Sequence, residues 1–91
     1  MDDKLLMDSA NELDHILRQY AEFDDEAKTM LRIISPLIQD ALSGKIITPF
    51  DWRKIPGIRF YAEGNLQRYN DLGEALATFK EALNKPANTA N

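Results

Sequence analysis

Residues 25–44, DEAKTMLRIISPLIQDALSG, decide the fold class of this chain. The stretch has apolar residues at Ala27, Met30, Leu31, Ile34, Leu37, Ile38, Ala41 and Leu42. Spacings of three and four are typical of one face of an α-helix. Asp24 or Asp25 can cap the start of this helix, and the closing glycine suits its end. We therefore predict a helix from about Asp25 to Ser43 that kinks at Pro36, and its wide apolar stripe predicts the central helix of the fold.

Two more segments show the same helical period. One runs from Asp3 to about Ala21, and the other begins at Asn70 or Asp71 and ends near Lys85. Their apolar stripes consist of Leu6, Ala10, Leu13, Leu17 and Tyr20 in the first, and of Leu72, Ala75, Leu76, Phe79 and Leu83 in the last. Each stripe is narrow, so each helix is expected to bury one face against the rest of the molecule.

The connection over residues 45–69 is less regular, because prolines and glycines interrupt it. We predict a short helix over Pro49–Lys54 and a helical turn or irregular coil within residues 57–64. Together these elements predict an all-α fold, a small antiparallel helical bundle of three main helices plus one or two short helices. Residues 1–85 are expected to form a single helical domain, and residues 86–91 a disordered tail.

Residues 49–64 carry four of the eight aromatic side chains. One interpretation is a plug that closes the open end of the bundle and to which Trp52 contributes most of the buried area. The candidates for this plug are Phe50, Trp52, Ile58 and Phe60. The other interpretation is an interface, because Trp, Tyr and Arg dominate binding hot spots. We favour the plug for the four apolar residues and assign Arg59 and Tyr61 to a partner-binding surface.

The charge of the chain is uneven. The net charge is −4, but residues 1–40 hold ten acidic and four basic residues, a net of −6, whereas residues 41–91 have a net of +2. A basic partner would therefore be steered toward the first half. The acidic balance disfavours nucleic acid. No segment reaches the roughly 20 apolar residues of a membrane span, and the acidic start is unlike a signal peptide. We expect a cytoplasmic protein that contacts neither nucleic acid nor membrane.

No set of residues predicts catalysis. The chain has no cysteine, which excludes thiol chemistry, disulfides and thiolate metal sites. His15 is the only histidine and has no catalytic partners beside it. Carboxylate pairs such as Asp8 with Glu12 are typical of a solvated helix face, and no glycine-rich phosphate loop is present. We therefore expect a protein that is not an enzyme and that binds no cofactor and no metal.

The order of these features resembles that of the small helical immunity proteins of type VI secretion effectors, in particular those that neutralise the NAD(P)-degrading toxin. The resemblance spans about Ile16 to Leu83. It lies in ILRQYAEF, LRIISPLIQDALSG, IPGIRFYAEG and NDLGEALATFKEAL. It implies a non-enzymatic cytoplasmic protein that binds a cognate toxin domain and blocks its active site. No catalytic residues carry over from this family.

The candidate partner-binding residues join the acidic first half to exposed parts of the connection. They are Asp8, Glu12, Tyr20, Glu22, Phe23, Asp25, Glu26, Arg59 and Tyr61. Tyr20 and Phe23 would be the apolar anchors, and the charges around them would set the association rate. Two alternatives remain open, an adaptor or regulatory module that binds a partner helix in a groove and an effector chaperone. A homodimer is also compatible with the sequence.

Overall fold

The computed structural model describes residues 3–47 and 49–84. Its elements are α1 (Asp3–Ala21), α2 (Asp25–Leu42), a 3₁₀ turn η1 (Trp52–Lys54), α3 (Ile58–Glu63), a second 3₁₀ turn η2 (Leu66–Arg68) and α4 (Asn70–Asn84). All regular elements in the described residues are helical, so the predicted all-α bundle is confirmed. The predicted disordered tail, residues 86–91, lies outside the described residues.

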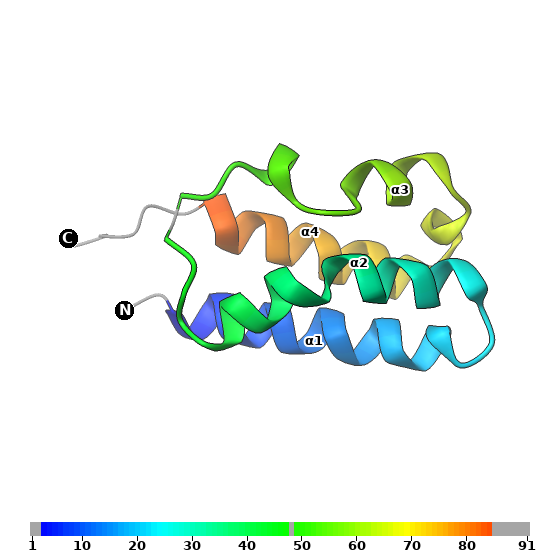
Figure 1. The fold of residues 1–91 in the computed structure, drawn as a ribbon, viewed down its shortest axis with the longest axis horizontal. Coiled ribbons are helices and arrows are strands. Elements are labelled where there is room, and N and C mark those ends of the chain that lie inside the picture. The colour runs from blue at the N-terminus through cyan, green and yellow to red at the C-terminus, as the bar shows by residue number, and fades with distance from the viewer. Residues whose placement is uncertain (1–2, 48, 85–91) are drawn as a thin grey trace.

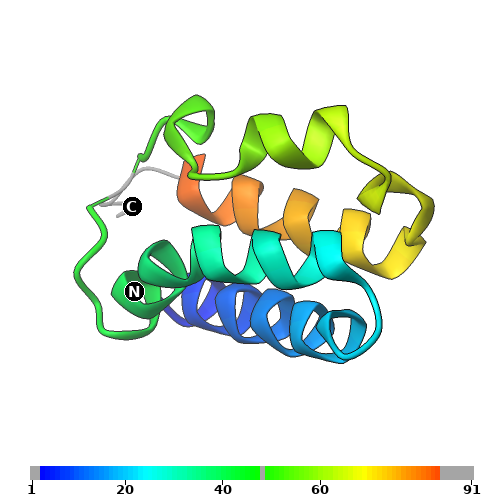
Figure 2. The same cartoon turned by 45° about the vertical axis from the view of Figure 1, so that its right-hand side comes forward.

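The long helices pack side by side, and the connection forms a fourth side (Figure 1). α1 and α2 are antiparallel, and α4 runs alongside α1 in the opposite direction. The connection with η1, α3 and η2 then runs the length of the bundle on the side away from α1 (Figure 2). The chain thus passes up and down four times, and its third passage is broken into short turns.

The prediction that the second helix is central is wrong. α1 packs along both α2 and α4, whereas α2 and α4 approach each other closely at few points. The wide apolar stripe of α2 has another cause, because the connection covers a second side of this helix. At Gly57 (φ +83°) an added Cβ would lie 3.0 Å from Met30 Sδ and 3.0 Å from Ile33 Cγ2. α2 therefore contacts α1 on one side and the start of α3 on another.

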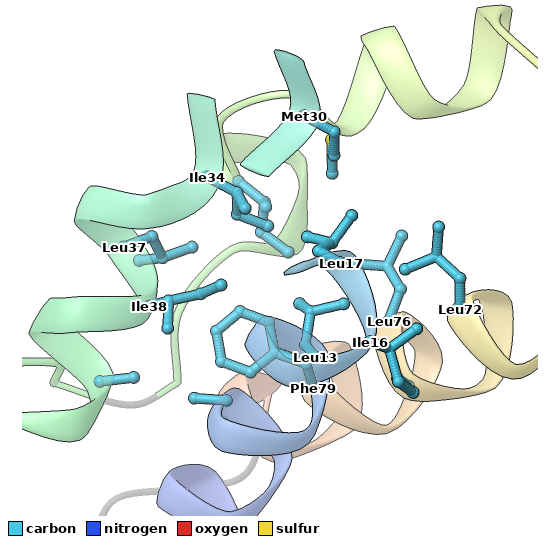
Figure 3. Close-up of a cluster of buried hydrophobic side chains, with 14 of the residues drawn as sticks. Leu13, Ile16, Leu17, Met30, Ile34, Leu37, Ile38, Leu72, Leu76 and Phe79 are labelled. Atoms are coloured by element: carbon cyan, nitrogen blue, oxygen red, sulfur yellow. The ribbon is translucent and has the colours of Figure 1, made fainter. Parts of the chain in front are cut away.

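The core lies between the three long helices. The largest fully buried side chains are Leu13, Leu17, Met30, Ile34, Ile38, Leu66, Leu72, Phe79 and Leu83. Side chains from all three long helices converge around Phe79 (Figure 3). Every long helix supplies the apolar stripe that its period predicted, and α2 remains one helix across Pro36.

The prediction that Trp52 plugs the core is wrong. Its side chain is 43% exposed, whereas Ile55 and Leu66 of the same connection are 2% and 0% exposed. Asp51 caps η1 by accepting a hydrogen bond from Arg53 N at 3.0 Å. Trp52 stays at the surface, with Lys80 Nζ 4.5 Å from the centroid of its ring. Ile55 and Leu66 are therefore the two fully buried side chains of this connection.

Phe50, Ile58 and Phe60 are half-buried and pack against this core. The plug interpretation therefore holds for these three side chains in part, as a wall along the bundle and not as a cap on its end. Phe50 N also donates to Leu83 O at 2.6 Å, which joins the start of this wall to the end of α4.

Replacing these two kinds of connection residue should have different costs. We expect Leu66→Ala to lower the free energy of unfolding by about 2–5 kcal/mol, because it leaves a cavity in a fully buried position. Trp52→Ala should cost less, about 1–2 kcal/mol, because the side chain is 43% exposed and its loss removes surface contacts, including that with Lys80, without leaving a closed cavity. Urea unfolding followed by far-ultraviolet circular dichroism measures both, since Trp52 is the only tryptophan and fluorescence would be lost with it. Equal losses for the two variants would contradict this account.

Candidate protein-binding site

The turn between α1 and α2 is held by one carboxylate. Asp24 Oδ1 accepts hydrogen bonds from Glu26 N at 2.8 Å and from Ala27 N at 3.3 Å, which caps α2. Asp24 Oδ2 accepts from Arg68 Nη2 at 2.6 Å and from the Tyr69 hydroxyl at 2.6 Å. Asp24 is only 9% exposed. This side chain therefore joins the α1–α2 turn to the junction between η2 and α4.

Tyr20 ties the end of α1 to the same junction. Its ring stacks on that of Tyr69, with centroids 3.8 Å apart and an angle of 20° between the rings. Its hydroxyl donates to Asp71 Oδ1 at 2.7 Å, and this hydrogen bond raises the pKa of Tyr20. Tyr20 is half-buried. Its ring and hydroxyl are thus both engaged within the molecule.

Glu26 makes a third tie, from α2 to the loop after α3. Its Oε1 accepts from Asn65 N at 2.7 Å, and its Oε2 from Asn65 Nδ2 at 3.2 Å. An added Cβ at Gly64 would lie 2.7 Å from Glu26 Oε1, so the tie needs the small residue before Asn65. We call the set of residues that makes these three ties the Asp24 network: Tyr20, Asp24, Glu26, Asn65, Arg68, Tyr69 and Asp71.

The electrostatics of the network favour an ionised Asp24. The hydrogen bond from Tyr69 is the main cause that lowers the pKa of Asp24, burial opposes it, and the α2 amides and the charge of Arg68 lower it further. The same hydrogen bond raises the pKa of Tyr69. At neutral pH the pair is therefore a carboxylate and a neutral hydroxyl donor.

Phe23 lies on this fixed turn but points away from the protein. It is 73% exposed and touches Tyr20 edge-on, with ring centroids 5.9 Å apart. Glu22 and Asp25 are exposed beside it. We call these three residues the Phe23 turn. It presents one aromatic side chain between two carboxylates at one end of the bundle.

The predicted site residues do not form one surface. Glu22, Phe23 and Asp25 lie together and are exposed, whereas Tyr20 and Glu26 are half-buried in the Asp24 network beneath them. These two serve as supports of the turn, and their polar atoms are already engaged.

The other four predicted residues lie elsewhere. Asp8 forms an exposed ion pair on α1, with its Oδ2 3.3 Å from Lys4 Nζ. Glu12 borders a hollow of about 220 Å³ between α1 and α4. Arg59 is exposed on α3. Tyr61 is half-buried, its hydroxyl lies 3.1 Å from where a Cβ on Gly73 would be, and burial raises its pKa.

The sequence predicted Asp24 or Asp25 as the cap, and the structure shows that it is Asp24. The partners Arg68 and Tyr69 were not predicted. Arg68 and Tyr69 follow Asp24 by 44 and 45 residues in the chain. A capping motif predicts the hydrogen bonds of one carboxylate oxygen to the helix amides, but not the partners of the other oxygen. Within residues 3–47 and 49–84, no three His, Asp or Glu side chains are grouped to hold a metal ion. In the same residues no helix has the length and apolar content to cross a membrane.

Comparisons with protein-family models, with curated proteins and with solved structures find no match to this chain.

Asp24→Asn tests the network. Asn can still cap α2, but its amide group would face the donors of Arg68 and Tyr69, so we expect a loss of about 2–3 kcal/mol in the free energy of unfolding at pH 7. The folded-state pKa of Asp24 is lowered, so its stabilisation is present above the unfolded value of about 4 and is lost as the pH falls through the folded value. The difference between wild type and variant should therefore shrink as the pH falls below about 4.

The matched control is Asp25→Asn, an exposed neighbour in the first turn of α2. It should cost well under about 1 kcal/mol at pH 7. Urea unfolding at several pH values measures both variants. Equal losses at Asp24 and Asp25, or a difference that does not change with pH, would contradict the role given to the Asp24 carboxylate.

Proposed function

We propose that this protein is a non-enzymatic immunity protein that binds a cognate bacterial toxin domain and blocks its active site. The observation that carries the proposal is the 73% exposure of Phe23 on a turn whose two neighbouring helices are tied down by the Asp24 network. Aromatic anchors dominate binding hot spots. An anchor that is already held in place loses less conformational entropy on binding.

The shape and charge of the turn suit the blocking of a cleft. The turn forms one end of the bundle, so it can enter a concave site on a partner (Figure 1). Glu22 and Asp25 beside Phe23 favour a basic entrance, as does the net charge of −6 over residues 1–40. Neutralising a cation-lined active site in this way needs no chemistry from the inhibitor.

The resemblance of the sequence to small helical immunity proteins of type VI secretion effectors supports a bacterial toxin domain as the partner. In this proposal the protein works in the cytoplasm of the cell that makes the toxin. Glu22, Phe23 and Asp25 contact the toxin, and Tyr20 and Glu26 position the turn. Asp8 and Glu12 add only long-range attraction.

Co-expression with the product of the adjacent gene tests the proposal. Cells that make the toxin should survive when wild-type protein is present, and the two proteins should be captured together. Phe23→Ala should raise the dissociation rate at least about tenfold, because the anchor is lost. Leu5→Ala is the control, because it shortens an exposed apolar side chain that lies on α1, away from the turn. It should leave the dissociation rate unchanged.

Glu22→Gln with Asp25→Asn should act differently from Phe23→Ala. Removing rim charges mainly slows association and flattens its dependence on salt. If cells die equally with and without this protein and no complex is captured, the immunity function is wrong. An adaptor that binds another protein then becomes the better explanation.

A further inference from the structure

A second surface with the opposite charge lies on the connection. A hollow of about 620 Å³ opens between η1 and α3, within the usual size range of binding pockets. Its lining consists of Trp52, Arg53, Ile58, Arg59, Ala62 and Glu63. We call it the Trp52 hollow. Its apolar part comes from the indole, Ile58 and Ala62.

Trp52 is shared by this hollow and its neighbours. Two further hollows border it, one toward Pro49 and Phe50 and the other toward Ala77 and Lys80 of α4. Lys80 Nζ lies 4.5 Å from the centroid of its ring, so a cation covers one face of the indole. Trp52 is 43% exposed, and tryptophan is one of the residue types that dominate binding hot spots.

The charges around the hollow favour an acidic occupant. Arg59 is exposed and makes no ion pair with another described residue. Arg53 forms an ion pair with Asp51, with Nε 3.1 Å from Oδ1. Glu63 is the one carboxylate in the lining of the hollow. Lys54 is exposed next to Arg53. An apolar side chain flanked by carboxylates would therefore complement the hollow in both shape and charge.

We propose that the Trp52 hollow binds the Phe23 turn of a second copy of this chain. The exposed large apolar side chains of the described residues are Leu5, Met7, Phe23, Ile47 and Trp52. Of these, Phe23 is the one that has exposed carboxylates on both sides, Glu22 and Asp25. In the contact Phe23 packs against Trp52 and Ile58, and the carboxylates face Arg53 and Arg59.

The contact forms between copies and not within one copy. The Phe23 turn lies at one end of the bundle, whereas η1 and α3, whose residues line the hollow, lie along its flank (Figures 1 and 2). A contact between one turn and one hollow is small, so the association is weak, in the high micromolar range or above. This inference does not rest on the immunity function, although a partner bound to Phe23 would exclude the second copy.

Sedimentation velocity of the full chain from about 10 µM to about 1 mM tests the proposal. The average mass of the wild type should rise with concentration, and the rise should weaken at high salt. Phe23→Ala and Trp52→Ala should each weaken association at least about tenfold. Leu5→Ala is the control and should associate like the wild type. Circular dichroism of each variant checks that it is folded.

A mixture of the two variants gives the sharpest result. Phe23→Ala keeps an intact hollow and Trp52→Ala keeps an intact turn, so an equimolar mixture should form heterodimers although each variant alone stays monomeric. Three results would overturn the proposal: a monomeric wild type at about 1 mM, association that survives in either variant alone, or a mixture that stays monomeric. The first result would leave the hollow to a segment of another protein.

Discussion

The Asp24 carboxylate accepts four hydrogen bonds, two from amides of α2, one from Arg68 and one from Tyr69. A carboxylate that is 9% exposed is costly unless such donors surround it. Because the four donors come from α2, η2 and the residue before α4, one side chain links these three elements at this end of the bundle. The Phe23 turn has its shape for the same reason.

The positions of the long helices were predictable because helical periodicity is a local property of the chain. The bounds of α1 agree with the apolar stripe and its polar flanks, and the start of α2 agrees with the acidic residues that cap it. Which helix is central was not predictable in this way. The stripe of α2 is wide because the connection also covers it, and a stripe does not identify the element that buries it.

The orientation of the connection could not be read from residue types. A tryptophan favours burial on average, yet the capped turn at Asp51 leaves Trp52 at the surface while Ile55 and Leu66 face the core. In a regular helix, the helical period would have predicted which of these three side chains is buried. In a segment of short turns, burial depends on how the segment packs on the rest of the molecule, and the sequence pattern does not show this.

The candidate site was predictable in its charge and not in its contacts. The acidic first half, together with Tyr20 and Phe23, predicted a partner-binding surface on the first helix and the start of the second, and Phe23 is exposed between these helices. Tyr20 and Glu26 are of the same residue types as the exposed members of the turn, one aromatic and one acidic. Their hydrogen-bond partners Asp71 and Asn65 lie 51 and 39 residues away along the chain, so their role inside the fold could not be predicted. Only the fold separates side chains that are free to bind from side chains that hold the turn.

Hydrogen bonds to the carboxylates of Asp24 and Glu26 keep the Phe23 turn fixed, and amide hydrogen exchange measured by NMR can detect them. Amides in the first turn of a helix have no acceptor within the helix, so they usually exchange fast. Here Glu26 N and Ala27 N bond to Asp24, and Asn65 N bonds to Glu26. These three amides should therefore exchange as slowly as those of the core helices. Exchange at the rate of an unstructured chain, in a protein whose core amides are protected, would contradict it.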